Sequence, residues 1–175
     1  MGPSRAKQRI VLGLDPGSRR TGFGIVRPRT EGLERVASGV IRLDEKRPFA
    51  ARLPKLRDGV VDVITSFHPT EAVLETCFVG RSARAALVLG HVRGVLLMLC
   101  LDAGLEVFEY APAEIKRAAT GQGNAPKEQV QEMLRRLILR IPERLVEDES
   151  DALATAYCHL SRPPVALPRP IKSLA

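Results

Sequence analysis

The sequence is poor in cysteine and has no long apolar run. Its three cysteines, Cys77, Cys100 and Cys158, lie in apolar stretches, and none has the CxxC pairing or the histidine spacing of a zinc site. We therefore expect buried thiols and no disulfide framework. No signal peptide is recognisable, and no apolar run reaches about 18 residues. These absences predict a soluble protein of a reducing cytoplasm, with no membrane contact.

The size and charge of the chain limit its organisation and its partners. The 175 residues fit one globular domain, and 45% hydrophobic residues can supply its core. Lys and Arg number 27 against 20 Asp and Glu, which gives a net charge of +7. This excess favours a polyanionic partner, although a basic surface can also serve solubility alone.

The chain divides into three segments by composition. Residues 1–8 form a basic leader, and residues 9–161 carry the apolar patterns of one domain. Residues 162–175 are rich in proline, with Pro163, Pro164, Pro168 and Pro170, and we predict a disordered tail.

The apolar patterns predict an α/β domain. We expect strands over residues 9–14, 21–26, 33–43, 72–74 and 105–108, because these are short, buried runs bounded by turn signals. Three- and four-residue apolar steps predict amphipathic helices over residues 53–67 and 82–103, and further helices follow from Pro112, through residues 130–138 and over 148–160. Five strands with helices between them indicate a mixed sheet covered by helices.

Four carboxylates stand where such a fold places functional groups. Asp15 ends the first predicted strand and Glu75 ends the fourth, so they face each other if these strands are neighbours. Asp148 and Asp151 are three positions apart and share one face of the last helix. Clustered carboxylates repel one another, and hard cations such as Mg²⁺ or Mn²⁺ would neutralise them. Two such ions can hydrolyse a phosphodiester to a 5′-phosphate and a 3′-hydroxyl.

Each of these residues also has a structural interpretation. Asp15, followed by Pro16 and Gly17, could simply begin a turn. Glu75 could be a solvated strand end, and Asp148 could cap the last helix. The combination of all four favours the metal site.

Four ordered segments resemble the RuvC family of Holliday junction resolvases. They are LDPGSRRTGFGIV (14–26), VLETCF (73–78), VFEYAPAEIK (107–116) and DESDALATAYCH (148–159). The resemblance runs from about residue 9 to about residue 160. It implies a ribonuclease H-like fold with a five-stranded mixed sheet, and a homodimer that makes paired nicks in opposed strands of a four-way junction during recombination and repair. It also implies RuvA and RuvB as partners.

The same resemblance assigns roles to individual residues. The ligands of two Mg²⁺ ions per subunit fall on Asp15, Glu75, Asp148 and Asp151. Phe78 stands where the family has an aromatic residue that stacks on bases, although it could equally be a core residue. Basic residues near the scissile phosphate fall on Lys116 and Lys127, which could also be ordinary surface charges. Arg81 and Arg84, with Arg93 on the same helix and Arg19 and Arg20 in the first turn, could hold further phosphates.

The sequence departs from the family pattern in two places. Gly80, Arg81 and Ser82 stand where Lys and Asn are common, which affects the expected DNA contacts. Glu149 and Ser150 stand between Asp148 and Asp151, where small residues are usual. As a fifth carboxylate, Glu149 could shift the metal preference toward Mn²⁺.

Three other functions remain open from the sequence. A sugar kinase or actin-like ATPase uses a related strand and glycine turn, but needs two lobes around its nucleotide, and 175 residues supply one. A ribonuclease H-like nuclease acting on RNA and a module that binds junctions without cutting them are both compatible with the fold.

Overall fold

The computed structural model describes residues 9–76, 82–162 and 171, which fold around one mixed sheet. Its strands are β1 (Val11–Asp15), β2 (Arg20–Arg29), β3 (Gly32–Arg42), β4 (Glu71–Glu75), β5 (Glu106–Tyr110) and β6 (Ile138–Leu139). The helices are η1 (Phe49–Arg52), α1 (Leu53–Phe67), α2 (Ala83–Asp102), α3 (Pro112–Thr120), α4 (Lys127–Leu137) and α5 (Glu147–Leu160). The expected α/β class and the five main strands are confirmed.

The strands lie in the order β5-β4-β1-β2-β3-β6. β1, β2 and β3 form an antiparallel meander. β4 then runs parallel to β1, and β5 runs parallel to β4. The carboxyl ends of β1, β4 and β5 therefore meet at one edge of the sheet, where open α/β sheets place their working groups.

The sheet has six strands and not the predicted five. The sixth is short and begins at Ile138, which the sequence pattern placed in the preceding helix. Ile138 instead has extended backbone, is 2% exposed and pairs with Leu33 of β3. Pairing with the sheet edge and burial of this β-branched side chain outweigh the helical pattern of α4.

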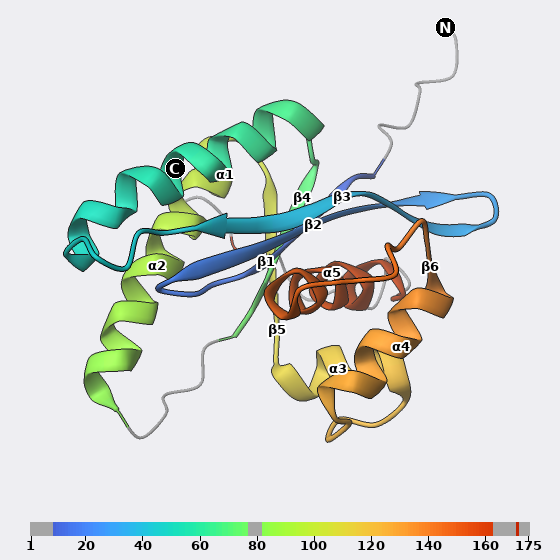
Figure 1. Cartoon of the computed structure of the whole chain (residues 1–175). Helices are drawn as coiled ribbons and strands as arrows, with labels where there is room; N and C mark the ends of the chain where they lie inside the picture. Colours follow the sequence, from blue (N-terminus) through green and yellow to red (C-terminus); the bar gives the residue numbers. More distant parts are fainter. Residues whose placement is uncertain (1–8, 77–81, 163–170, 172–175) are drawn as a thin grey trace, which may run out of the picture.

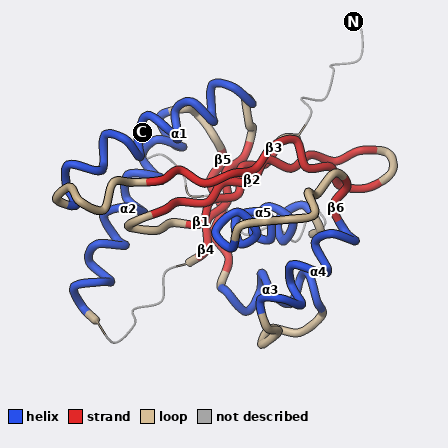
Figure 2. Tube along the Cα trace, in the orientation of Figure 1, coloured by secondary structure: helices blue, strands red, loops and turns tan. Residues whose placement is uncertain are grey.

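Helices cover both faces of the sheet (Figures 1 and 2). α1 and α2 lie on one face, over a core that includes Leu12, Leu56 and Leu96. α3, α4 and α5 lie on the other, over a core that includes Val73, Leu134 and Leu153. α5 packs directly on β1 and β2, so its position relative to the sheet determines where its own side chains lie.

Small residues allow α5 to approach the sheet closely. A Cβ added to Gly13 would lie 2.0 Å from the carbonyl oxygen of Ala152, and one added to Gly22 would lie 1.9 Å from that of Asp148. Real Cβ atoms do not come this near to backbone. The close approach of α5 to the sheet therefore requires glycine at these two positions. Glycine is otherwise disfavoured in the interior of a strand.

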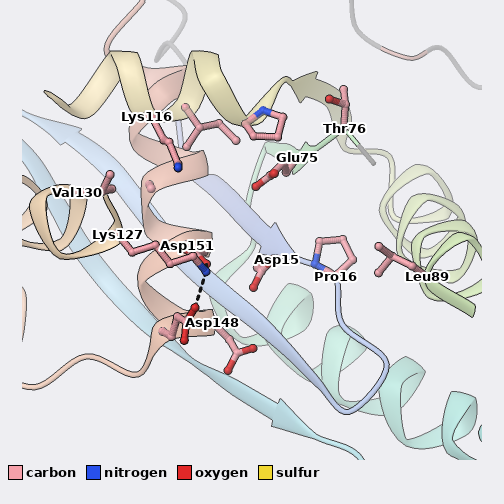
Figure 3. A pocket seen from close by; sticks show the side chains of 14 residues that line it. Asp15, Pro16, Glu75, Thr76, Leu89, Lys116, Lys127, Val130, Asp148 and Asp151 are labelled. Atoms are coloured by element: carbon pink, nitrogen blue, oxygen red, sulfur yellow. Dashed lines mark hydrogen bonds and ion pairs between the residues drawn. The ribbon is translucent and has the colours of Figure 1, made fainter. Parts of the chain in front are cut away.

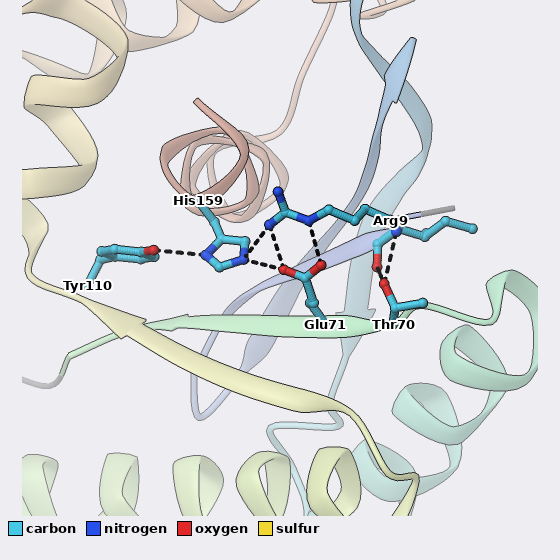
Figure 4. A network of polar contacts seen from close by, with 6 residues as sticks. Arg9, Thr70, Glu71, Tyr110 and His159 are labelled. Carbon is cyan, nitrogen blue, oxygen red and sulfur yellow. Dashed lines mark hydrogen bonds and ion pairs between the residues drawn. The ribbon is translucent and has the colours of Figure 1, made fainter. Parts of the chain in front are cut away.

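A buried polar network fixes the far end of α5 (Figure 4). Arg9 donates two hydrogen bonds of 2.7 Å to the carboxylate of Glu71, the first residue of β4. His159 is fully buried, and its ring contacts Glu71 through Nε2 and the Tyr110 hydroxyl through Nδ1 at 2.8 Å. The network joins the residue pair before β1, the first residue of β4 and the last turn of α5 to Tyr110, the last residue of β5.

The outer face of α2 is apolar as well as its inner face. Val92, Leu96 and Cys100 are buried against the sheet, as predicted, but Leu87 is 64% and Met98 51% exposed. By length and composition alone α2 could cross a membrane, with a mean hydropathy of 1.7 over its most apolar window. The expectation of an amphipathic helix was therefore wrong for its exposed side.

Candidate active site

The register of the central strands brings Asp15 and Glu75 together. Leu14 of β1 lies opposite Leu74 of β4 in the parallel pair, and each carboxylate is the next residue along its strand. The two strands are neighbours, so the condition attached to the sequence prediction is met. Because β1 and β4 are held by the sheet, the backbone of both carboxylates is fixed.

α5 contributes the other two carboxylates. Asp148 and Asp151 lie in its first two turns, and with Asp15 and Glu75 they line a pocket of about 490 Å³. Figure 3 shows all four around this space. Asp148 follows the first residue of α5, so it is not the N-cap, which is Val146.

Crowding of negative charge is visible in the pKa of two carboxyls. Burial, together with the charges of Asp151, Glu75 and Asp148, raises the pKa of Asp15 to about 7. Burial also raises the pKa of Glu75, together with the charge of Asp151. Lys127 opposes both shifts. The pocket therefore carries negative charge that its own cations only partly balance.

Lys127 is the cation that contacts the carboxylates directly. Its Nζ lies 2.9 Å from Oδ2 of Asp151 and also contacts Glu147. Burial lowers the pKa of Lys127, but these two contacts outweigh burial and raise it. Lys127 stays charged, and Glu147 and Asp151 hold it at the wall of the pocket.

The donor atoms suit a hard cation. All four carboxylates offer oxygen, and Oδ2 of Asp148 is buried without a hydrogen bond, although Nε of Arg20 lies 3.4 Å away. In the described ranges, no three acidic, histidine or cysteine side chains are arranged to hold an ion as they stand. These side chains would have to lie closer together than they do here to hold an ion jointly.

The predicted DNA-contact residues divide into three groups. Lys116, on α3, lines the same pocket as Lys127. Arg84 is exposed in the first turn of α2 and lines an adjoining groove. Phe78 and Arg81 lie outside the described residues, as does Cys77.

Arg93 does not project toward a phosphate as expected. Its side chain is 13% exposed, and its guanidinium donates to the backbone carbonyl of Glu75 and to the carboxylate of Glu109. The planar fork of arginine suits such a double contact. Arg93 therefore fixes the end of β4, directly behind Glu75.

Glu149 is not a fifth ligand of the pocket. It is 8% exposed, and its carboxylate accepts a hydrogen bond from Ser38 on β3 and lies 3.6 Å from Nη2 of Arg35. Successive helical residues point in different directions, so Glu149 faces the sheet while its two neighbours at 148 and 151 face the pocket. The position of Glu149 therefore gives no support to the Mn²⁺ preference expected from the sequence.

Sequence reasoning missed two contributors to the site. Glu147 contacts Lys127, and Gly22 makes room for the start of α5. The glycine had a signal, since a glycine within a predicted strand marks a close approach of backbone. Glu147 had none, because its partner is distant in sequence. Arg20, expected to hold a phosphate, lies beside Asp148.

The family model of the crossover junction endodeoxyribonuclease RuvC matches residues 11–159. RuvC of Anaeromyxobacter sp. (strain Fw109-5) is 48% identical over 153 residues, which are 87% of this chain and 73% of that protein. RuvC of Halorhodospira halophila is 48% identical over 152 residues, 85% of this chain and 88% of its own.

A solved structure extends the likeness to three dimensions. RuvC of T. thermophilus, in complex with a Holliday junction substrate, superposes with a TM-score of 0.85 at 27% identity, over 93% of this chain and 99% of that one. The ribonuclease H-like fold expected from the sequence is confirmed. The chain belongs to the RuvC family of crossover junction endodeoxyribonucleases, metal-dependent enzymes that resolve Holliday junctions.

Proposed function

We propose that Asp15, Glu75, Asp148 and Asp151 hold two Mg²⁺ ions in each subunit and form the catalytic centre of this resolvase. The observation that carries the proposal is that carboxylates from β1, β4 and α5 line one pocket. When bound, such a pair of ions activates a water and stabilises the leaving oxygen of a phosphodiester. The products are a 5′-phosphate and a 3′-hydroxyl.

The protein's own side chains position the reacting strand. The sheet fixes the backbone positions of Asp15 and Glu75. The packing of α5 on the sheet fixes those of Asp148 and Asp151. Lys127 and Lys116 line the same pocket and offer positive charge to the scissile phosphate. Lys127 pairs with Asp151 and Glu147, and it would be available for that contact if Asp151 held an ion.

DNA contacts beyond the pocket involve Arg84, Arg81 and Phe78. Arg84 is supported by its exposure in the groove beside the pocket. Phe78 rests on the family resemblance, in which the aromatic residue stacks on bases at the crossover, whereas Arg81 rests on its positive charge, because it departs from the family pattern. Stacking tolerates any sequence and contributes about 1 to 3 kcal/mol per base.

The outer face of α2 supports a homodimer. Leu87 and Met98 are exposed, and Gly90 and Gly94 between them have open space where a side chain would be. Two copies of this helix could therefore approach closely across a twofold axis. Since a four-way junction has the same symmetry, two active sites related in this way would make symmetric nicks.

The cellular setting follows from the same proposal. We assign the apolar face of α2 to a second subunit and not to lipid, because its opposite face packs on the sheet. The protein then works as a soluble dimer in the cytoplasm. RuvA and RuvB, which move junctions, are the partners that the family resemblance implies.

One assay tests the proposed function against its rivals. The protein is incubated with a synthetic four-way junction, a linear duplex and an RNA hairpin, in Mg²⁺, in Mn²⁺ and in EDTA. We expect paired nicks in opposed strands of the junction only, and only with a metal. Cleavage of the RNA would favour a ribonuclease, binding without nicks would favour a non-cleaving module, and ATP hydrolysis without DNA would favour the kinase class.

A further inference from the structure

The segment between β3 and α1 concentrates positive charge at the end of the sheet where Asp15 lies. Residues 42–55 together with Arg19 and Arg20 include seven Lys or Arg side chains and two acidic ones, a net +5 in a chain with a total of +7. We name its exposed cations the basic shelf: Arg19, Arg42, Lys46, Arg47 and Lys55. The acidic residues are Asp44 and Glu45, and Glu45 pairs with Arg19 at 3.1 Å.

Arg52 holds this segment in place. Its guanidinium donates to three backbone carbonyls, those of Arg47 at 2.9 Å, Glu45 at 2.8 Å and Ser18 at 3.3 Å. The first two belong to the shelf segment, and the third belongs to the turn that follows Asp15. A single planar side chain thus ties the shelf to the loop leading out of the carboxylate pocket.

A groove beside the carboxylate pocket reaches the loop that Arg52 binds. The carboxylate pocket adjoins a groove of about 530 Å³, and Leu89 lines both. Gly17, Ser18 and Arg84 line the groove, and the carbonyl of Ser18 is the one that Arg52 binds. In Figure 1 the β3–α1 loop and the β1–β2 turn lie at the same end of the molecule.

We propose that the basic shelf binds the phosphates of the DNA arm that leaves the carboxylate pocket along this groove, with Arg52 as its positioning residue. The inference rests on the proposed function, since it extends the path of the same substrate. Within the described ranges, Arg42, Lys46, Arg47 and Lys55 form no ion pair with an acidic side chain. Their charge is available to a polyanion, and phosphate contacts position DNA without reading its sequence.

The test compares two variants with the same change in charge. The shelf variant carries Arg42→Gln, Lys46→Gln and Arg47→Gln. The control carries Arg135→Gln, Arg136→Gln and Arg144→Gln, which removes exposed arginines on and after α4, away from the shelf. Both are made in the 175-residue protein with Asp15→Asn, so that junction binding is measured in Mg²⁺ without cleavage. Affinity is followed over a range of salt concentrations.

The expected result is a change in the salt dependence. Each lost phosphate contact lowers the slope of log K against log salt by about 0.9, so the shelf variant should lose about 2 to 3 units of slope and about 10-fold or more in affinity at low salt. The control should stay within about twofold of the parent. Equal slopes for the shelf and control variants overturn the inference.

A second variant separates position from charge. Arg52→Lys keeps the charge, but an ammonium cannot hold three carbonyls in one plane. The Arg52→Lys protein should keep a normal melting temperature. Its affinity for the junction should fall toward that of the shelf variant. An unchanged affinity would refute the role of Arg52. If the unsubstituted chain neither binds nor cuts junctions, the proposed function itself fails, which is a distinct outcome.

Discussion

The α carbon of Gly22 faces the backbone carbonyl of Asp148, and a Cβ there would lie 1.9 Å from that oxygen. The obstacle is backbone, so the start of α5 would have to move away from the sheet. We predict that Gly22→Ala lowers the free energy of unfolding by about 1 to 3 kcal/mol and reduces cleavage far more than junction binding. Chemical denaturation and a nicking assay measure the two effects.

Gly59→Ala is the matched control for this prediction. A Cβ at Gly59 meets side-chain atoms of Ile41, the nearest at 2.8 Å, and no backbone, and alanine favours the helical backbone of α1 by about 1 kcal/mol. The control should remain active and close to the original stability. An active, stable Gly22→Ala protein would show that the close packing of α5 on the sheet does not determine the geometry of the site.

Replacing Asp15 tests the role of the central carboxylate. Asp15→Asn keeps the shape of the pocket but removes an anionic oxygen, and with it one proposed ligand. We expect cleavage to fall by about 10³-fold or more while junction affinity is retained. The folded protein should also bind Mg²⁺ more weakly by calorimetry. Full cleavage by this variant would remove Asp15 from the ligand set.

The Glu71 network predicts a stability that depends on acid pH. Burial by itself would raise the pKa of Glu71, but hydrogen bonds from Arg9 and His159 outweigh burial and lower the pKa to about 2. The charged form therefore contributes stability above about pH 4.5, and this contribution is lost as the pH falls toward about 2. We expect it to be about 2 kcal/mol.

Glu71→Gln should lose this contribution at every pH. Urea unfolding at neutral pH should show the variant to be less stable, and the gap to the unsubstituted protein should narrow as the pH falls below about 4.5. A gap that stays constant down to about pH 3 would contradict the assigned ion pair. The carboxylate pocket is at the opposite end of β4, so metal binding should be largely retained.

Glu149 should affect stability and not metal choice. Its carboxylate contacts Ser38 and lies near Arg35, on the sheet side of α5. We predict that Glu149→Gln lowers stability by about 1 to 2 kcal/mol and leaves the ratio of activities in Mg²⁺ and Mn²⁺ unchanged. A shifted ratio would restore the interpretation of Glu149 as a metal ligand.

Charge on the outer face of α2 should separate the subunits. Leu87→Glu with Met98→Glu places two charges on the apolar face, and burying them in a dimer would be costly. Light scattering should show monomers, and the nicks in opposed strands should become independent. Val61→Glu, at a 40% exposed position of α1, is the control and should remain dimeric. A dimeric double variant would place the interface elsewhere.

The sequence predicted the strands and the four carboxylates because their signals are local. A buried apolar run that ends in a charge, as at Leu74 and Glu75, already indicates a strand and its functional end. The resemblance to RuvC covered most of the chain, so it fixed the fold. The sequence did not show that β1 and β4 are neighbours, and the prediction that Asp15 faces Glu75 depended on this. Strand order is set by contacts between distant segments.

The errors came where a tertiary contact outweighed a local pattern. Ile138 pairs with β3 and is not part of the helix before it. Arg93 contacts Glu75 and Glu109, and Glu149 contacts Ser38. The sequence near these residues does not indicate which distant residues they contact. For charged side chains in particular, the number of possible partners is too large for spacing alone to select one.

The close contact of α5 with the sheet has a consequence for ion size. The proposed ligands Asp148 and Asp151 belong to the helix, whereas Asp15 and Glu75 belong to the strands, so the spacing between helix and sheet sets the distance between the two halves of the proposed site. Gly13 against Ala152 and Ala156 helps to determine that spacing. Substitution of these three small residues could therefore alter the selection between smaller and larger divalent ions without changing any proposed ligand.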